Sequence, residues 1–186
     1  METTYIETQQ ISFQDFKNQI LEDFRLGRIS REMSYLGRRE VLTGKAKFGI
    51  FGDGKELPQL AMAKVFKDGD FRSGYYRDQT FALAINAVTV ESFFAQLYAD
   101  TSIEREPASA GRQMNGHYAT RSLNEDGSWK DLTKQKNISS DISPTAGQMP
   151  RLLGLALASK VYKSVTYDGA EKFSNKGNEV AFGTIG

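Results

Sequence analysis

The sequence predicts an α/β fold that is mostly helical and contains few parallel strands. Residues 12–24 and 88–98 both place apolar side chains at helical spacing. Residues 180–185 form a continuous apolar run, which is typical of a buried parallel strand. The 186 residues can bury a sizeable core. We expect an N-terminal helical segment over residues 1–44, followed by a second part of the fold over residues 45–186.

The N-terminal 44 residues carry two helical patterns separated by a glycine. Ser12 is a suitable N-cap for the first helix. The apolar residues of this helix form a stripe along one face: Phe13, Phe16, Ile20, Leu21 and Phe24. We expect a break at Gly27, because glycine destabilises the interior of a helix. The second helix should end at Gly44 and turn its apolar residues inward: Ile29, Met33, Leu36 and Val41.

The rest of the chain alternates short helices, short strands and loops. A loop over residues 43–55 precedes a helix at 56–66, in whose first turn Pro58 is tolerated. The following segments predict, in order, a turn at 67–70, a short strand at 70–73, a helix at 79–85, the amphipathic helix at 88–98, an irregular segment at 100–136, a short strand at 137–143, a helix at 144–162 and a polar segment at 163–178. Small residues in the 144–162 helix predict that a sheet or a partner chain packs closely on it.

The composition excludes several classes of site and of partner. The chain has no cysteine, which excludes disulfides, thiolate metal sites and cysteine nucleophiles. The single histidine, His117, excludes a zinc site with several histidines. A formal net charge of +1 without a tight basic cluster argues against nucleic acid and anionic membranes. The chain starts with a polar, acidic stretch and has no apolar run of roughly 18 residues, so we expect a cytoplasmic protein without a membrane span.

Two short segments are suited to bind a phosphorylated ligand. Arg77 offers a planar fork of donors that can contact two phosphate oxygens at once, and Tyr76 adds a hydroxyl donor. The alternative is a surface ion pair between Arg77 and Asp78, with Tyr76 as a core aromatic residue. The Ser143-Pro144 turn supplies irregular backbone just before a helix, which can contact a ligand or simply cap the helix that follows.

Several motifs occur in a characteristic order. The chain contains Gly74-Tyr-Tyr-Arg-Asp78, an amphipathic helix, Gly111-Arg-Gln-Met-Asn-Gly-His-Tyr118, Ile142-Ser-Pro-Thr-Ala-Gly-Gln-Met-Pro150 and an apolar strand. This series, over residues 27–186, resembles the alpha subunit of thiamine diphosphate-dependent 2-oxoacid dehydrogenases of the branched-chain and pyruvate type. The resemblance implies the N-terminal part of a three-layer α/β/α fold that binds thiamine diphosphate. Residues 45–186 would be the first part of that domain, truncated at its C-terminus.

The resemblance implies cofactor contacts for five residues. Tyr76 and Arg77 match the pair that binds the diphosphate. Ser143 and Thr145 match residues whose backbone groups approach the aminopyrimidine ring. Gly186 matches the first glycine of a motif that binds Mg²⁺ through a carboxylate and an amide, so the metal ligands are expected beyond this residue. We therefore assign no residue of the chain to catalysis or to the metal.

Three further positions are interpreted with the same resemblance in view. Gln148 matches a ligand of a structural monovalent cation, but Gly147 stands where a threonine would help to bind it. His117 lies in a glycine-rich loop near the family's active-site channel, and we interpret it as a structural hydrogen-bonding residue. Gly52-Asp53-Gly54 looks like the metal motif, but its spacing to Asn86 is too long, so we predict a turn.

The function implied by the resemblance is the oxidative decarboxylation of a 2-oxoacid, with transfer of the acyl group to a lipoyl group. The implied partners are a beta subunit or fused beta domain, a lipoyl acyltransferase component and the 2-oxoacid substrate. We also expect homo-oligomers, because helix faces of the chain would stay uncovered. Alone, the chain should be inactive and bind the cofactor weakly or not at all. The alternatives are a non-catalytic binding or interaction module on the same architecture, and an unrelated helical interaction domain.

Overall fold

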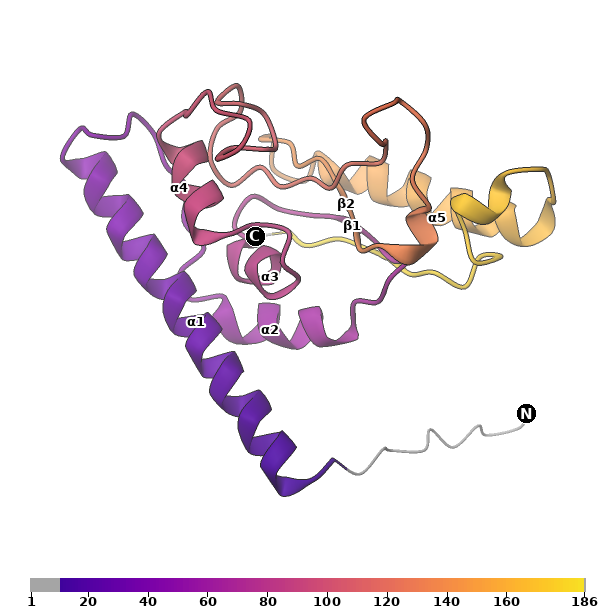
Figure 1. Ribbon diagram of the computed structural model, residues 1–186, viewed down its shortest axis with the longest axis horizontal. Coiled ribbons are helices and arrows are strands. Elements are labelled where there is room, and N and C mark those ends of the chain that lie inside the picture. Colours follow the sequence, from indigo (N-terminus) through magenta and orange to yellow (C-terminus); the bar gives the residue numbers. More distant parts are fainter. Residues whose placement is uncertain (1–10, 186) are drawn as a thin grey trace.

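The computed structural model describes residues 11–185, in which helices surround a small central sheet (Figure 1). The α-helices are α1 (Phe13–Leu42), α2 (Glu56–Val65), α3 (Gln79–Ala84), α4 (Val90–Leu97) and α5 (Gln148–Ser164). The strands are β1 (Phe71–Ser73), β2 (Asn137–Ser139) and β3 (Ala181–Phe182). Two short 3-10 helices complete the set, η1 (Leu132–Lys134) and η2 (Ala170–Lys172).

The sheet has the order β2-β1-β3, and β1 pairs in parallel with both neighbours. Arg72 of β1 lies opposite Ile138 of β2 and Phe182 of β3. This small parallel sheet among helices confirms the predicted α/β class. The thiamine diphosphate-binding form of the fold and the division at residue 44 stay predictions.

The two faces of the sheet are covered by different helices. Successive side chains of a strand point to opposite faces. On one face, Ile138 and Phe182 pack with Phe66 and Phe81, so this face meets α2 and α3. On the other face, the Ser73 hydroxyl donates to the backbone oxygen of Gln148 at the start of α5, at 3.1 Å. The described elements are therefore layered as helix, sheet and helix.

The expectation for residues 180–185 was only partly correct. Residues Ala181 and Phe182 do form a parallel strand. However, β3 lies at the edge of the sheet, and the flanking Val180 and Ile185 are 57% and 59% exposed. The buried-strand prediction is therefore wrong within the described residues, because only β1 pairs with this segment and only Phe182 reaches the core.

Residues 13–42 form one continuous helix, so the predicted break at Gly27 is wrong. A Cβ at Gly27 would lie 3.7 Å from the Leu60 side chain, which shows that α2 packs against the helix at this point. Packing of this kind offsets the cost of about 1 kcal/mol that glycine imposes on a helix interior. The predicted helix ends are confirmed, since Ser12 accepts the Asp15 N–H at 3.1 Å and Gly44 follows the helix with a φ of +76°.

The apolar stripe on the first half of α1 is exposed to solvent. Its members are between 49% and 80% exposed: Phe13, Phe16, Ile20, Leu21 and Phe24. Only the second half of α1 enters the core, where Met33 packs with Leu83 and Phe93. The small residues of α5 were predicted to lie against a sheet or a partner chain. The contact of α5 with the sheet is formed near Gln148, but Gly154 faces open space.

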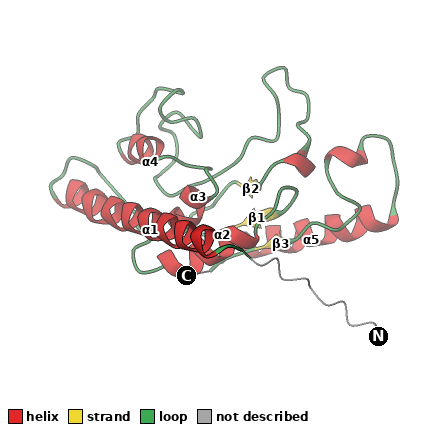
Figure 2. Ribbon diagram, turned by 60° about the horizontal axis from the view of Figure 1, so that its bottom comes forward, coloured by secondary structure: helices red, strands yellow, loops and turns green. Residues whose placement is uncertain are grey.

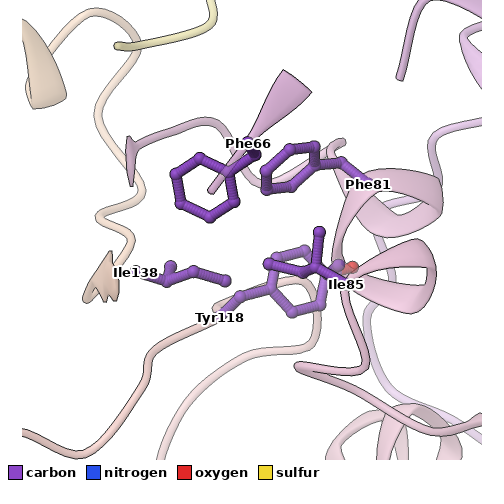
Figure 3. Close-up of a cluster of buried hydrophobic side chains, with 6 residues drawn as sticks. Phe66, Phe81, Ile85, Tyr118 and Ile138 are labelled. Carbon is purple, nitrogen blue, oxygen red and sulfur yellow. The ribbon is translucent and has the colours of Figure 1, made fainter. Parts of the chain in front are cut away.

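The main core lies between α2, α3 and the sheet (Figure 3). The Phe66 and Phe81 rings are 5.3 Å apart at an interplanar angle of 55°. Ile85, Tyr118 and Ile138 complete the contacts from α3, the 111–118 loop and β2. This core fixes α3, which follows the Tyr76-Arg77 turn directly, together with the end of the 111–118 loop.

The chain between α4 and β2 is largely loop, as predicted (Figure 2). Its regular features are η1 and an antiparallel bridge between Leu123 and Trp129. Within residues 11–185, no helix combines the length and the apolarity that a membrane crossing requires.

Candidate functional site

Tyr76 and Arg77 lie in the tight turn between β1 and α3. The Asp78 carboxylate closes this turn by accepting the Tyr75 N–H at 3.2 Å. Gly74 is required before the turn, because a Cβ there would lie 1.9 Å from the Arg72 guanidinium carbon. The turn is therefore shaped by the residues that precede and follow the candidate pair.

The side chains of the turn form a stacked aromatic and cationic group. The Tyr75 and Tyr76 ring centroids are 4.1 Å apart, and the Arg77 guanidinium carbon lies 5.5 Å and 5.4 Å from them. Arg77 donates to the Tyr75 hydroxyl at 2.8 Å, and this hydroxyl donates to that of Tyr76 at 3.0 Å. Hydrogen bonds from Tyr75 and, second, Thr145 lower the pKa of the Tyr76 hydroxyl below its usual value. Thr145 thus reaches the same group from the other candidate segment.

Ser143 is held by His117. The His117 Nε2 lies 2.9 Å from the Ser143 Oγ, and its Nδ1 lies 3.0 Å from the Met114 carbonyl oxygen. Because a carbonyl oxygen can only accept, Nδ1 carries the ring proton in the neutral imidazole. Nε2 then accepts the hydrogen bond from the Ser143 hydroxyl. His117 is thus a structural hydrogen-bonding residue in this arrangement, which agrees with its interpretation from sequence.

The glycine-rich loop packs directly on the tyrosine-arginine turn. A Cβ at Gly116 would lie 2.7 Å from the backbone oxygen of Tyr76, and Gly116 has a φ of +79°. Only glycine fits this approach without a shift of the backbone. Tyr76, His117, Ser143 and Thr145 therefore lie in one place, although they come from three segments of the chain.

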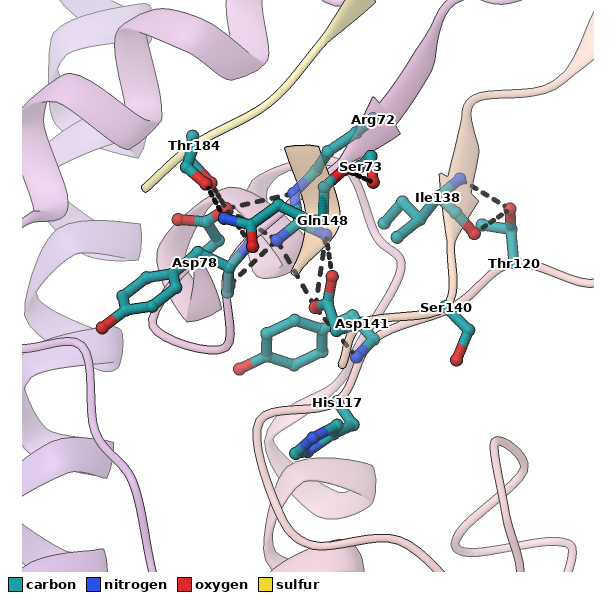
Figure 4. Close-up of polar contacts among 12 residues, drawn as sticks. Arg72, Ser73, Asp78, His117, Thr120, Ile138, Ser140, Asp141, Gln148 and Thr184 are labelled. Atoms are coloured by element: carbon teal, nitrogen blue, oxygen red, sulfur yellow. Dashed lines mark hydrogen bonds and ion pairs between the residues drawn. The ribbon is translucent and has the colours of Figure 1, made fainter. Parts of the chain in front are cut away.

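A buried arginine connects these segments (Figure 4). Arg72 is 0% exposed. It donates to Asp78 at 2.6 Å and to Asp141 at 3.2 Å, and it also donates to the Tyr75 carbonyl oxygen at 3.0 Å. Asp141 in turn accepts the Tyr118 N–H at 3.2 Å. Arg72 thus links the turn of residues 75–78 to the corner that contains Ser143.

The electrostatics of this cluster are unbalanced, because one cation faces two carboxylates. Burial raises the pKa of the Asp141 carboxyl above its usual value, although the charge of Arg72 opposes this rise. The alternative ion pair between Arg77 and Asp78 does not appear among the ion pairs of residues 11–185, since Asp78 pairs with Arg72 instead. Arg72 was not among the residues predicted for the site. The available signal was a charged residue in the middle of a strand expected at residues 70–73.

The last described residues also reach this cluster. The Thr184 hydroxyl donates to Asp78, and the Thr184 carbonyl oxygen accepts from the amide of Gln148, which is 2% exposed. A Cβ at Gly147 would lie 2.6 Å from the Ile142 side chain, so a threonine does not fit there without a shift. The Gln148 amide nitrogen is thus engaged with protein.

The remaining candidates are placed as follows. Gly186 lies outside the described residues. Asp53 of the Gly52-Asp53-Gly54 turn forms an ion pair with Arg38 at 2.7 Å, which agrees with the predicted turn. Within residues 11–185, no group of three or more His, Asp or Glu side chains is arranged to hold a metal ion.

Comparison with known proteins links the chain to one enzyme subunit. No family model matches the sequence. The chain is 30% identical over 142 residues to the 2-oxoisovalerate dehydrogenase subunit alpha of Bacillus subtilis (strain 168). The match covers 73% of this chain but only 37% of the relative. The chain is thus a distant homologue of a 2-oxoacid dehydrogenase alpha subunit.

Proposed function

We propose that the chain contributes part of the thiamine diphosphate site of a 2-oxoacid dehydrogenase. The observation that carries this proposal is the meeting of three segments at one place. Gly116 packs on the Tyr76 backbone, His117 holds Ser143, and the Thr145 side chain reaches the Tyr76 hydroxyl. These segments are the ones that resemble the family's motifs. The similarity of the chain to the Bacillus subtilis subunit supports the same family.

Arg77 and Tyr76 are assigned to the diphosphate. Arg77 is half-buried, and no carboxylate lies within ion-pair distance of it in the described part of the chain. An arginine without a carboxylate partner can direct its planar fork to phosphate oxygens. The Tyr76 hydroxyl accepts from Tyr75, so its own proton remains available to a phosphate oxygen. These features fit a doubly phosphorylated ligand.

The corner of Ser143, Pro144 and Thr145 is assigned to the aminopyrimidine ring. All three residues are exposed, so a ligand can reach their backbone groups. Because the Ser143 hydroxyl donates to His117, its side chain is held in one orientation. Asp141, two residues earlier, anchors the corner to the buried Arg72.

When bound, thiamine diphosphate supplies the electron sink for decarboxylation of a 2-oxoacid. The residues of this chain bind and orient it, and we assign no proton transfer to them. We further propose that a beta subunit or fused beta domain supplies the activating carboxylate, that Mg²⁺ is bound by residues other than those described, and that a lipoyl acyltransferase receives the acyl group. A cytoplasmic location also belongs to this proposal.

One observation favours a second candidate, a non-catalytic interaction module. The exposed stripe of α1, from Phe13 to Phe24, is larger than single scattered apolar residues on a surface. The interaction module and the enzyme component differ in what they require of Arg77 and Ser143. A module that binds no cofactor does not require an arginine that can contact phosphate oxygens.

The test separates the two halves of the cofactor. The ¹⁵N-labelled chain is titrated with thiamine, with inorganic pyrophosphate and with thiamine diphosphate, each with Mg²⁺, and amide chemical shifts are followed. Thiamine should shift the amides of Ser143 and Thr145. Pyrophosphate should shift those of Tyr76 and Arg77, and thiamine diphosphate should shift both groups.

Two variants control this experiment. Arg77→Gln should remove the shifts at the turn and leave those at Ser143 and Thr145. Arg121→Gln, at an arginine that donates to the Pro107 backbone oxygen, should change neither group. The proposal narrows the expectation for the isolated chain to weak binding in the millimolar range. It is refuted if thiamine diphosphate leaves both groups unchanged at millimolar concentration, or shifts only residues elsewhere, such as those at the end of α5.

A further inference from the structure

Gln96, a buried side chain of α4, holds the backbone of His117 at two points. The Gln96 Nε2 donates to the His117 carbonyl oxygen at 3.1 Å, and the His117 N–H donates to the Gln96 Oε1 at 3.3 Å. Because a backbone N–H can only donate and a carbonyl oxygen can only accept, one orientation of the side-chain amide satisfies both bonds. Gln96 is 5% exposed, so water competes little for these groups.

The helix that carries Gln96 is itself firmly held. Phe93, one turn earlier in α4, packs with Met33 and Leu83 in the second cluster of the core. Residues three apart lie on the same side of a helix, so Gln96 lies on the packed side of α4. The first turn of α4 is closed by a capping box between Thr89 and Ser92. Gln96 therefore offers His117 a fixed support.

The loop that contains His117 is held at a second place by Asn115. The Asn115 Nδ2 donates to the Ile50 carbonyl oxygen at 2.9 Å, and its Oδ1 accepts the Ile50 N–H at 3.0 Å. Gly116 separates Asn115 from His117 and has a φ of +79°. Because glycine has wide backbone freedom, the contact at Asn115 does not by itself fix the direction of His117. The two bonds from Gln96 supply this missing constraint.

We infer that Gln96 is a positioning residue for the corner at Ser143, and that it acts through His117. Gln96 fixes the backbone of His117, and the Met114 carbonyl oxygen accepts from the His117 Nδ1. The His117 Nε2 then accepts from the Ser143 hydroxyl. This inference deepens the proposed function and rests on it, since the corner is the one assigned to the aminopyrimidine ring.

The first measurement reads the orientation of His117 without any ligand. His117 is the single histidine of the chain, so its two ring nitrogens give unambiguous ¹⁵N signals. At about pH 8, where the imidazole is neutral, Nδ1 should appear protonated and Nε2 unprotonated. Gln96→Met keeps a similar side-chain length and removes both bonds to His117. In this variant the two nitrogen signals should move towards each other, because the ring exchanges between its tautomers.

The second measurement reads the consequence at the proposed site. The ¹⁵N-labelled Gln96→Met chain is titrated with thiamine and with inorganic pyrophosphate, each with Mg²⁺. The affinity for thiamine, followed at the amides of Ser143 and Thr145, should fall on the order of fivefold. The affinity for pyrophosphate, followed at Tyr76 and Arg77, should change less than about twofold. A purely structural role of Gln96 would weaken both affinities alike.

Asn137→Ala is the matched control, because it removes another buried side-chain amide. Asn137 is 4% exposed and donates to three backbone oxygens, those of Asp70, Leu132 and Gln135. This variant should unfold at a lower urea concentration, but its His117 nitrogen signals and its affinity for thiamine should match those of the unchanged chain.

A second variant keeps the inference testable if Gln96→Met does not fold, as judged by far-UV circular dichroism. Gln96→Glu retains the acceptor for the His117 N–H and loses the donor. It should move the ring-nitrogen signals of His117 in the same direction as Gln96→Met and likewise weaken the affinity for thiamine.

The outcomes separate this inference from the proposed function. If the unchanged chain binds thiamine and the Gln96 variants leave both the ring nitrogens and this affinity unaltered, the role of Gln96 is wrong and the proposed function stands. If Asn137→Ala has the same effects as Gln96→Met, the role of Gln96 is again wrong, because the effects then reflect general stability. If the unchanged chain shows no thiamine shifts at Ser143 and Thr145, the ring-binding corner and this inference both fail.

Discussion

Replacement of the buried Arg72 should destabilise the fold more than any other single change at the candidate site. Arg72→Met keeps a similar chain length but leaves Asp78 and Asp141 buried without a cation. Removal of one partner from a buried ion pair costs about 3–5 kcal/mol of unfolding free energy. Arg72 uses three donors for two carboxylates and the Tyr75 carbonyl oxygen, so the upper part of this range applies.

The measurement is thermal and urea unfolding followed by circular dichroism. In a chain of 186 residues, each kcal/mol shifts the melting temperature by about 2–4 °C, so a fall of roughly 8–20 °C is expected. Arg28→Met is the control, because Arg28 pairs with Glu32 on the surface at 2.7 Å. This control should lower the unfolding free energy by no more than about 1 kcal/mol.

The same variant also tests the positioning role of Arg72. At a temperature where Arg72→Met is still folded, the amide signals of Tyr75 and Tyr118 should shift most, since both segments lose an anchor. If Arg72→Met unfolds within about 1 kcal/mol of the unchanged chain, then the ion cluster does not hold the three segments together and the reasoning fails.

Three further predictions follow from the fold. Gly116→Ala should cost about 1–3 kcal/mol more than Gly127→Ala in urea unfolding, because both residues have positive φ but only Gly116 meets backbone, and equal costs would contradict this. Asp141→Asn should be less destabilising at pH 7 than at pH 4. Because the pKa of the Asp141 carboxyl is raised in the folded state, its contribution to stability is complete below the usual pKa of 3.8 and is lost as the pH rises through the folded-state pKa. If Asp141→Asn lowers the free energy of unfolding in urea by the same amount at both pH values, this prediction is wrong. The double variant Phe16→Glu, Phe24→Glu should reduce self-association in sedimentation velocity, and an unchanged distribution would exclude the α1 stripe as its cause.

Local patterns predicted most of the elements, because those elements are decided by nearby residues. The helix at 56–66, the strand at 70–73 and the helix at 79–85 agree with α2, β1 and α3 to within a few residues. The predicted break at Gly27 is wrong because a residue distant in sequence determines the structure there. The contact of α2 at Leu60 lies more than thirty residues along the chain, and no local pattern around Gly27 reports it. The exposure of Val180 likewise depends on where β3 joins the sheet.

The candidate ligand-binding residues were predicted from motifs, whereas the buried ion pairs that hold their segments in place were not. Tyr76, Ser143 and Thr145 were chosen because they resemble a family's cofactor contacts, and the fold brings their segments together. The pairing of Arg72 with Asp141 joins residues 69 positions apart and depends on the register between β1 and β2. This register places Arg72 opposite Ile138, three residues before Asp141. Sequence spacing alone does not contain that information.

The candidate site divides its residues by burial, and this division has a physical reason. Groups that would contact a cofactor, such as Arg77 and Ser143, remain half-buried or exposed, and they gain by exchanging water for phosphate or for a ring edge. Groups that only hold the backbone, such as Arg72 and Asp78, are almost fully buried, where ion pairs are least screened by salt. A rigid buried cluster under an exposed binding surface lowers the entropy lost when a ligand binds. Because Asp78 follows Arg77 directly and Asp141 precedes Ser143 by two residues, one guanidinium group anchors both candidate segments.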